Sequence, residues 1–199
     1  YEVGRPRLEP VAAFRSVANT PSIAVLLVTA SRVMVVWQGS TSFLPTYLHY
    51  AKGYSTVHAA YLFAALFGVG IAATPTAGYL GGRFGYLRTG VVSTVSGAAG
   101  LFLLTQTQSH YGALCSIVLF AIGLSAFWPL LYTYLAGQFA VAQIGASFGV
   151  LRTVFFAAGS LCPVLVGLIA ELFGYTASFW VLGGLFLAGS VGLGVARRV

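Results

Sequence analysis

Six long apolar segments, separated by short gaps, constrain this sequence more than any other feature. A helix needs about 20 mostly apolar residues to cross a bilayer, and each segment is close to that length. The sequence contains no series of ten-residue alternating strands, which a membrane-spanning barrel would require. The pattern therefore predicts an all-α membrane protein with six transmembrane helices, each antiparallel to the next. The segments cover roughly residues 22–48, 57–80, 89–106, 112–137, 145–171 and 177–196.

The composition excludes most soluble classes of protein. Only 7% of the 199 residues are charged and 58% are hydrophobic, whereas a soluble domain carries about 25% charged residues. A net charge of +7 would suggest a nucleic-acid binder in a soluble chain. Here the bases lie between apolar segments, where they set membrane topology instead, so nucleic acid is not expected as a partner. Cys115 and Cys162 lie in apolar segments without a metal-binding spacing, and no cofactor or metal is expected.

The basic residues also predict an orientation in the cell membrane. With six spans both termini lie on one side, and the other side carries Lys52 alone. By the positive-inside rule the side rich in bases is cytoplasmic. Residues 1–21 are then a basic cytoplasmic arm or linker, and residues 22–199 form the six-helix bundle. The bases on the cytoplasmic side are Arg5, Arg7, Arg15, Arg83, Arg88, Arg197 and Arg198.

Two stretches of the first half recur in the second. Residues 39–45 (GSTSFLP) resemble residues 123–129 (GLSAFWP), and residues 78–86 (GYLGGRFGY) resemble residues 167–175 (GLIAELFGY). Each offset corresponds to three helices, and three crossings invert the direction of the chain. Chance recurrence of Gly, Phe and Pro is the alternative, but two matches in consistent order favour a three-plus-three inverted repeat.

Residues 22–196 resemble the carboxy-terminal half of a major facilitator superfamily transporter. The resemblance rests on the FLPTYL segment (43–48) with the GYS loop that follows it, on the loop 78–88, and on residues 163–179. The loop departs from the family's basic signature at Gly82, where the family has an aspartate, so an arginine–carboxylate latch cannot form within it. The signature positions that remain are Gly78, Arg83, Gly85 and Arg88.

The resemblance implies a fold of twelve helices in two halves, which rock about a substrate site near the bilayer midplane. The expected partners are the lipid bilayer, a missing amino-terminal six-helix half and a small-molecule substrate. The family also places its cavity on the first, second, fourth and fifth helices of each half.

Candidate substrate-binding residues follow from depth and side-chain type. Arg32 lies near the middle of the first helix, on a polar stripe with Gln38, where a charge is costly unless it faces a cavity. An arginine there can bind an anionic group bidentately, although it can also be capped by backbone carbonyls or snorkel. Arg152 is shallower and can supply a second anion contact or snorkel to the headgroups. The aromatic candidates can equally serve in interhelix packing. The full candidate set is Arg32, Gln38, Tyr61, Trp128, Tyr132 and Arg152.

The leading hypothesis is half of a secondary active transporter that moves a small solute by alternating access. Two membrane arginines suit an organic anion, and only Glu171 lies near the membrane among the acids, so this half supplies little proton coupling. The alternatives are a self-pairing half-transporter and a non-transporting six-helix protein, either a scaffold or an intramembrane enzyme. No nucleophile–base pair stands out, so an enzyme is not expected.

Overall fold

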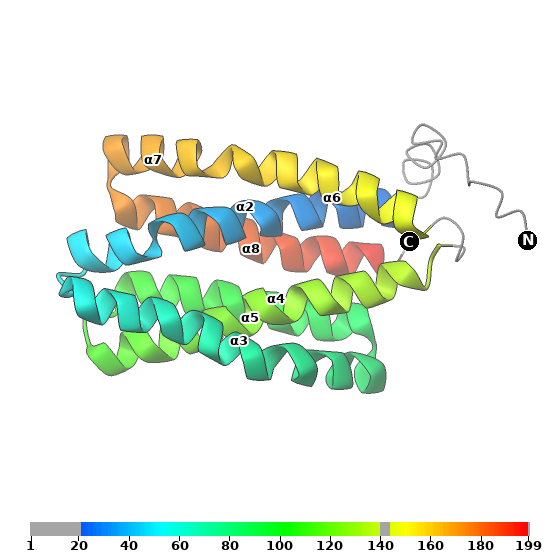
Figure 1. Ribbon diagram of the computed structural model, residues 1–199, viewed down its shortest axis with the longest axis horizontal. Coiled ribbons are helices and arrows are strands. Elements are labelled where there is room, and N and C mark those ends of the chain that lie inside the picture. Colours follow the sequence, from blue (N-terminus) through cyan, green and yellow to red (C-terminus); the bar gives the residue numbers. More distant parts are fainter. Residues whose placement is uncertain (1–20, 140–143, 199) are drawn as a thin grey trace, which may run out of the picture.

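The computed structural model describes residues 21–139 and 144–198 of the chain and confirms the all-α fold (Figure 1). No strand occurs within these two ranges. Six stretches of helix are long and apolar enough to cross a membrane, with α6 and α7 together forming one of them. Apart from Pro21, the expected cytoplasmic arm lies outside the described residues. The helices are α2 (Pro21–Tyr50), α3 (Thr56–Phe84), α4 (Tyr86–Gln106), α5 (His110–Ala136), α6 (Ile144–Ser160), α7 (Cys162–Phe173) and α8 (Tyr175–Ala196).

Single glycines join two pairs of antiparallel helices. Gly85 lies between α3 and α4 with φ 94°, and Gly174 lies between α7 and α8 with φ 85°. Each glycine N–H donates to a carbonyl four residues earlier, at 2.9 Å, and so caps the preceding helix. A positive φ is readily accessible only to glycine, which explains the residue type at both positions. The sequence predicted loops at 81–88 and 172–176, and this was wrong: the helices continue to within one residue of each other.

The fifth span is interrupted at Leu161, two residues before Pro163. α6 ends at Ser160 and α7 begins at Cys162, with Pro163 in its first turn. Proline has no N–H to donate to the carbonyl four residues earlier, and its ring crowds that carbonyl, which weakens the helix at this point. Pro45, Pro75 and Pro129 lie inside α2, α3 and α5 without such a break. Figure 1 shows α6 and α7 lying end to end along one edge of the bundle.

The helix contacts reveal the inverted repeat. α2 packs against α8 and against α6 and α7, just as α5 packs against α4 and α3. α4 and α8, the third helices of the two triples, pack against each other. The matched glycines Gly85 and Gly174 adopt similar backbone angles at equivalent helix junctions. The three-plus-three repeat expected from the sequence is therefore present in the packing.

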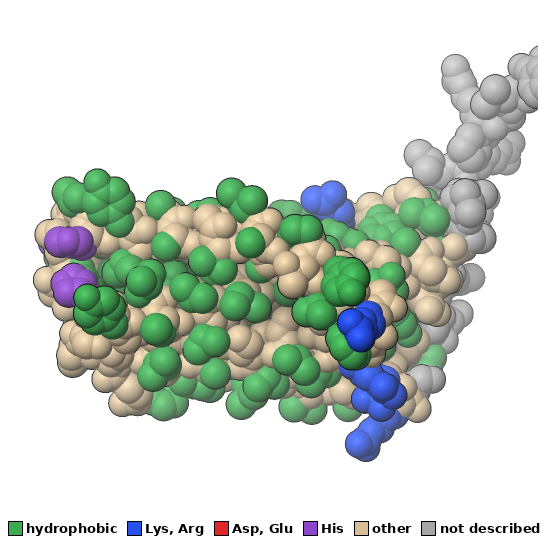
Figure 2. All heavy atoms as spheres, turned by 90° about the horizontal axis from the view of Figure 1, so that it is seen from below, with side chains coloured by type: hydrophobic (Ala, Val, Ile, Leu, Met, Phe, Trp, Pro, Cys, Tyr) green, Lys and Arg blue, Asp and Glu red, His purple; other side chains and the backbone are tan. Residues whose placement is uncertain are grey.

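The two ends of the bundle differ in charge. Arg88 and Arg197 line one surface hollow together with residues 84–87, so the α3–α4 junction and the end of α8 share an end. Lys52 and the three histidines lie at the opposite end, where Lys52 contacts the α4–α5 connection. Figure 2 shows most of the visible Lys and Arg side chains toward one end and His side chains at the other.

Lys52 links the α2–α3 connection to the α4–α5 connection by hydrogen bonds. Its Nζ donates to the carbonyl oxygens of Thr105 and Thr107, each at 2.8 Å. These carbonyls lie at the end of α4, where they have no partner within the helix and where a cation is favoured. Burial lowers the pKa of Lys52, so the two bonds offset a desolvation cost.

We expect Lys52→Met to lower the unfolding free energy by about 1 kcal/mol, since the ammonium is partly exposed and its bonds are screened. The measurement is thermal unfolding of the purified protein in detergent. Arg83→Met, which removes an exposed base at the other end of the bundle, is the matched control. Equal melting temperatures for the two variants would contradict the proposed tie.

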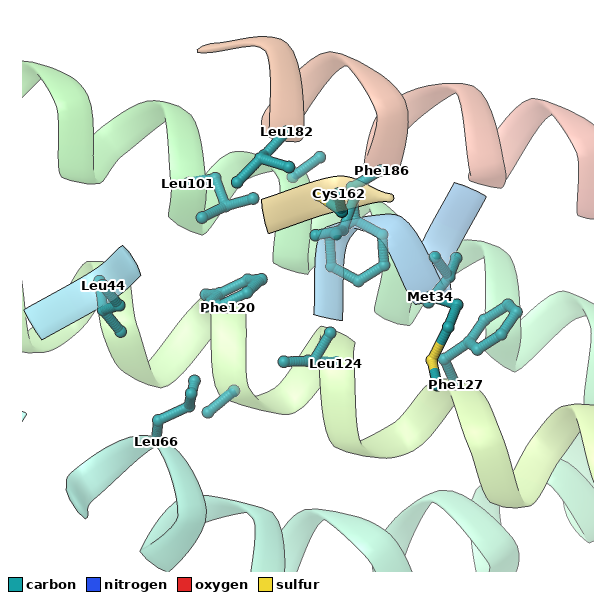
Figure 3. Close-up of a cluster of buried hydrophobic side chains, with 14 of the residues drawn as sticks. Met34, Leu44, Leu66, Leu101, Phe120, Leu124, Phe127, Cys162, Leu182 and Phe186 are labelled. Carbon is teal, nitrogen blue, oxygen red and sulfur yellow. The ribbon is translucent and has the colours of Figure 1, made fainter. Parts of the chain in front are cut away.

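The bundle is held by one main apolar core that draws on every helix. Figure 3 shows its centre, where Phe120 and Leu124 of α5 lie between side chains of other helices. Phe120 and Phe186 meet edge to face with their ring centroids 6.1 Å apart. Small residues let the helices approach, since a Cβ at Gly97 would collide with Phe186.

Candidate functional site

A pocket of about 210 Å³ opens between α2, α5 and α6. Its walls are mainly aromatic, and its polar groups are one side-chain amide, one phenol and two indole N–H groups. Within the described part of the chain, no hydrogen bond occupies these side-chain polar groups. A concave apolar site with a few available polar groups is typical of a small-molecule site. The lining residues are Met34, Trp37, Gln38, Trp128, Tyr132, Phe155 and Phe156.

The pocket exists because α6 approaches α2 closely at a glycine. A Cβ on Gly159 would lie 2.7 Å from Met34 Cγ and 3.2 Å from Gln38 Cγ. A larger side chain at this position would require Met34 and Gln38, which line the pocket, to shift. Gly159 thereby allows α6 to pack closely against the wall that α2 supplies.

Aromatic rings pack against one another along the α5 and α6 walls. Trp128 lies 5.2 Å from Phe155 and 5.8 Å from Tyr132, measured between ring centroids. Tyr132 in turn lies 5.7 Å from Phe148. Ring pairs at these distances stabilise each other beyond simple burial.

Arg152 is the charged residue at the edge of the pocket. Its guanidinium lies 5.6 Å from the ring centre of Phe156 and 6.0 Å from that of Tyr132. Both rings line the pocket, so the charge sits over its aromatic wall. The side chain is exposed, and within the described residues no carboxylate pairs with it. The guanidinium donors therefore remain available to an anionic group.

The structure brings four of the six candidate residues together. Gln38, Trp128 and Tyr132 line the pocket, and Arg152 lies over it. Arg32 is exposed on α2 and does not line this pocket. Tyr61 is 70% exposed on α3 and does not line it either.

The signature residues lie at the end of the bundle that carries the bases. Gly78 and Arg83 belong to α3, Arg88 belongs to the first turn of α4, and Gly85 joins the two helices. They are not part of the pocket. Of the four, Gly85 forms the tight junction between the two helices.

Four lining residues of the pocket lie outside the candidate set: Met34, Trp37, Phe155 and Phe156. Phe155 and Phe156 follow Arg152 by three and four positions, so all three share one face of α6. That spacing could have identified Phe155 and Phe156 from the sequence, because aromatic rings one turn from a membrane arginine can hold its guanidinium.

A larger groove of about 400 Å³ lies elsewhere, between α3, α4 and α5. No charged side chain of the described residues lines it, and its walls are mostly Ala, Val, Leu and Ile with four hydroxyl side chains. Unlike this groove, the pocket between α2, α5 and α6 combines aromatic walls with a guanidinium at its edge. The pocket between α2, α5 and α6 is therefore the better candidate for a solute site.

Comparisons with known proteins agree with this architecture. The sequence model described as Major Facilitator Superfamily matches residues 61–198. A comparison with curated proteins gave no match. Among solved structures, the POT family transporter PepTSo superposes with a TM-score of 0.73 at 16% sequence identity, over 89% of this chain and 37% of that one. The human organic anion transporter MFSD10 (TETRAN) superposes with a TM-score of 0.74 at 18% identity, over 93% of this chain and 46% of that one.

The chain thus spans less than half the length of either solved transporter. At this level of identity the superpositions show the shared fold, whereas the sequence model covers more than half of the chain. Together with six spans in an inverted repeat, these matches establish that the chain belongs to the major facilitator superfamily.

Proposed function

We propose that this chain is the carboxy-terminal half of a secondary transporter that moves a small organic anion across the cell membrane by alternating access. The observation that carries the proposal is the aromatic pocket with the Arg152 guanidinium at its edge. In the proposed assembly the pocket forms this half's share of a substrate site between two six-helix halves.

Two of the six spans are buried inside the bundle to a much smaller extent than the other four. Only 11% of the apolar window of α3 and 22% of that of the α6–α7 span are buried, against 44% to 56% for the other spans. Gly159, where α6 packs against α2, and Pro163, which follows the break in the span, both lie on the poorly buried α6–α7 segment. We infer that the amino-terminal half covers these helices and closes the pocket from the open side, and that lipid covers the remaining surface.

The pocket favours a particular chemistry of substrate. Its aromatic walls suit a planar or apolar body, while Gln38 and Tyr132 offer donors and acceptors for orientation. Arg152 offers donors to a carboxylate, sulfonate or phosphate. Because membrane surroundings weaken solvent screening, an anion near Arg152 is bound more strongly than it would be in water.

The basic residues indicate how the bundle is oriented in the membrane. We infer from the positive-inside rule that the α3–α4 junction and the carboxy terminus, which carry Arg83, Arg88, Arg197 and Arg198, face the cytoplasm. The end with Lys52 and the histidines then faces outward. Tagging each end with an externally modifiable cysteine would check this orientation directly.

The function is tested by uptake into proteoliposomes that contain the complete transporter. The panel pairs aromatic carboxylates and sulfonates with neutral and cationic analogues of the same size. We expect uptake of the anionic members only, and counterflow when the liposomes are preloaded with the same anion, because alternating access permits exchange. Uptake of cationic analogues at equal rates would contradict the proposed substrate class. If none of these compounds is taken up, and this chain stays folded on its own as a dimer, the results would favour a self-pairing or non-transporting protein.

Trp128→Ala tests the aromatic wall. Removing the indole takes away one wall of the pocket and its contacts with Phe155 and Tyr132. We expect the KM for an aromatic anion to rise about tenfold, which corresponds to about 1.4 kcal/mol of lost binding. Trp180→Ala is the matched control, since Trp180 packs on Phe102 away from the pocket. An equal rise in KM in both variants would argue against a specific wall.

A further inference from the structure

Two histidine rings from different helices lie next to each other at the end of the bundle opposite the arginines. His58 belongs to the first turn of α3, and His110 is the first residue of α5. Their ring centroids are 5.3 Å apart, with an interplanar angle of 59°. Both side chains are exposed, and Figure 2 shows His side chains close together at this end. The proposed transport mechanism makes no use of this pair.

Neighbouring residues hold both rings in place. The Nδ1 of His58 lies 3.0 Å from Ser55 Oγ, which also accepts a hydrogen bond from the His58 backbone N–H. The Tyr54 ring meets the His110 ring edge to face at 4.8 Å. The Tyr54 hydroxyl donates to Ser109 O at 3.3 Å and so fastens that ring to the start of α5. The pair is therefore positioned by contacts on both helices.

We propose that His58 and His110 form a surface site for a divalent late transition metal, of which Zn²⁺, Ni²⁺ and Cu²⁺ are the candidates. A Zn–N bond of about 2.0–2.1 Å, extended by about 1.1 Å from nitrogen to ring centre, places each centroid about 3.2 Å from the metal. Two such rings at a tetrahedral angle would have centroids about 5.2 Å apart. The distance in the structure is 5.3 Å.

The surroundings of His58 also fit a ligand. A metal-binding histidine usually donates its second ring N–H to a neighbouring acceptor, which fixes the tautomer. In the Nδ1–H tautomer of His58, Ser55 Oγ is such an acceptor, and the Nε2 lone pair is left for the metal. Within the described residues no three metal-binding side chains come together, so water would complete the coordination. Two ligands beside two helix N-termini, which disfavour cations, make this a weaker site than a closed structural zinc site.

A bound metal would link the start of α3 to the start of α5. These helices belong to opposite triples of the inverted repeat and already pack against each other. The metal would add a crosslink at their outward ends, so the folded protein gains stability as the metal is added. This effect does not depend on the identity of any transported solute.

The test is zinc binding by the purified protein in detergent, carried out with an affinity tag that contains no histidine. All variants carry Cys115→Ser, because Cys115 is an exposed thiol that can bind zinc itself. Calorimetry gives the affinity, and thermal unfolding with and without zinc gives the stabilisation. Cu²⁺ with electron paramagnetic resonance counts the coordinating nitrogens.

We expect His58→Gln and His110→Gln each to lower zinc affinity at least tenfold, and to reduce the number of nitrogens on Cu²⁺ from two to one. Ser55→Ala is expected to lower the affinity about tenfold through loss of the supporting acceptor. His49→Gln is the matched control, because His49 Nδ1 contacts Tyr54 O and lies outside the pair. Unchanged affinity in His58→Gln or His110→Gln, or no binding by the parent protein at millimolar zinc, would overturn the proposal.

Discussion

Replacing Gly123 with valine should prevent the protein from accumulating in a folded, monodisperse form. Gly123 lies where α5 crosses α4, and a Cβ there would lie 2.5 Å from both the Gly97 Cα and the Ser93 carbonyl oxygen. Both atoms belong to the α4 backbone, so no change of side-chain rotamer can make room. Overpacking typically costs 1–3 kcal/mol, and a collision with backbone should exceed about 3 kcal/mol.

The measurement compares the yield, the gel-filtration profile and the melting temperature of Gly123→Val with those of the parent protein. Gly184→Val is the matched control, because a Cβ at Gly184 on α8 would meet nothing within 4 Å. The control adds the same atoms to another apolar helix, and we expect it to behave like the parent protein. Normal folding of Gly123→Val would mean that α4 and α5 pack less closely than the structure shows.

Gly39, the counterpart of Gly123 in the inverted repeat, should tolerate an added methyl group better than Gly123. A Cβ at Gly39 would lie 2.7 Å from Cys162 Sγ and 3.0 Å from a Leu182 methyl group, so its close neighbours are side chains. Side chains can shift, whereas the backbone of a packed helix cannot. Gly39→Ala is therefore milder than Gly123→Ala, although the sequence repeat makes the two glycines look equivalent.

Hydropathy and helix length predicted the number, order and approximate limits of the spans. These features depend on each segment alone, because a helix in lipid satisfies its backbone hydrogen bonds internally. The repeat was also visible, because Gly85 and Gly174 mark equivalent junctions. The prediction failed on the length of those junctions, since a polar, glycine-rich stretch such as 81–88 is typical of a loop. Whether α3 stops early or continues to Phe84 depends on the single left-handed glycine that follows it.

The candidate site was harder to predict than the fold. Sequence position gives the depth of a residue in the membrane, and on depth alone Arg32 is the stronger candidate. Which way a helix faces depends on its packing, and α2 turns Gln38 toward the pocket while Arg32 lies on its exposed surface. Arg152, although shallower, is held over the pocket by Tyr132 and Phe156. A single helical wheel cannot supply this information, because the neighbouring helices determine it.

Arg152→Gln should therefore have a larger effect on transport than Arg32→Gln. A hydrogen bond to a charged group contributes about 1.5–3 kcal/mol, and each 1.36 kcal/mol changes a rate or binding constant tenfold. We expect kcat/KM for uptake of an organic anion by the complete transporter to fall about 10- to 100-fold in Arg152→Gln. Glutamine keeps an amide donor but removes the charge and shortens the side chain, so the loss of uptake combines lost electrostatic recognition with lost reach.

Two further variants separate anion binding from folding. Arg152→Lys retains the charge but cannot bind an oxyanion bidentately, and we expect it to recover part of the lost uptake. Arg32→Gln should stay within about threefold of the parent protein, because Arg32 faces away from the pocket. Cell-surface abundance and melting temperature must match among the variants for the comparison to hold. If Arg32→Gln abolished uptake while Arg152→Gln preserved it, the anion would bind against α2 outside the aromatic pocket, and the assignment of the site would have to be abandoned.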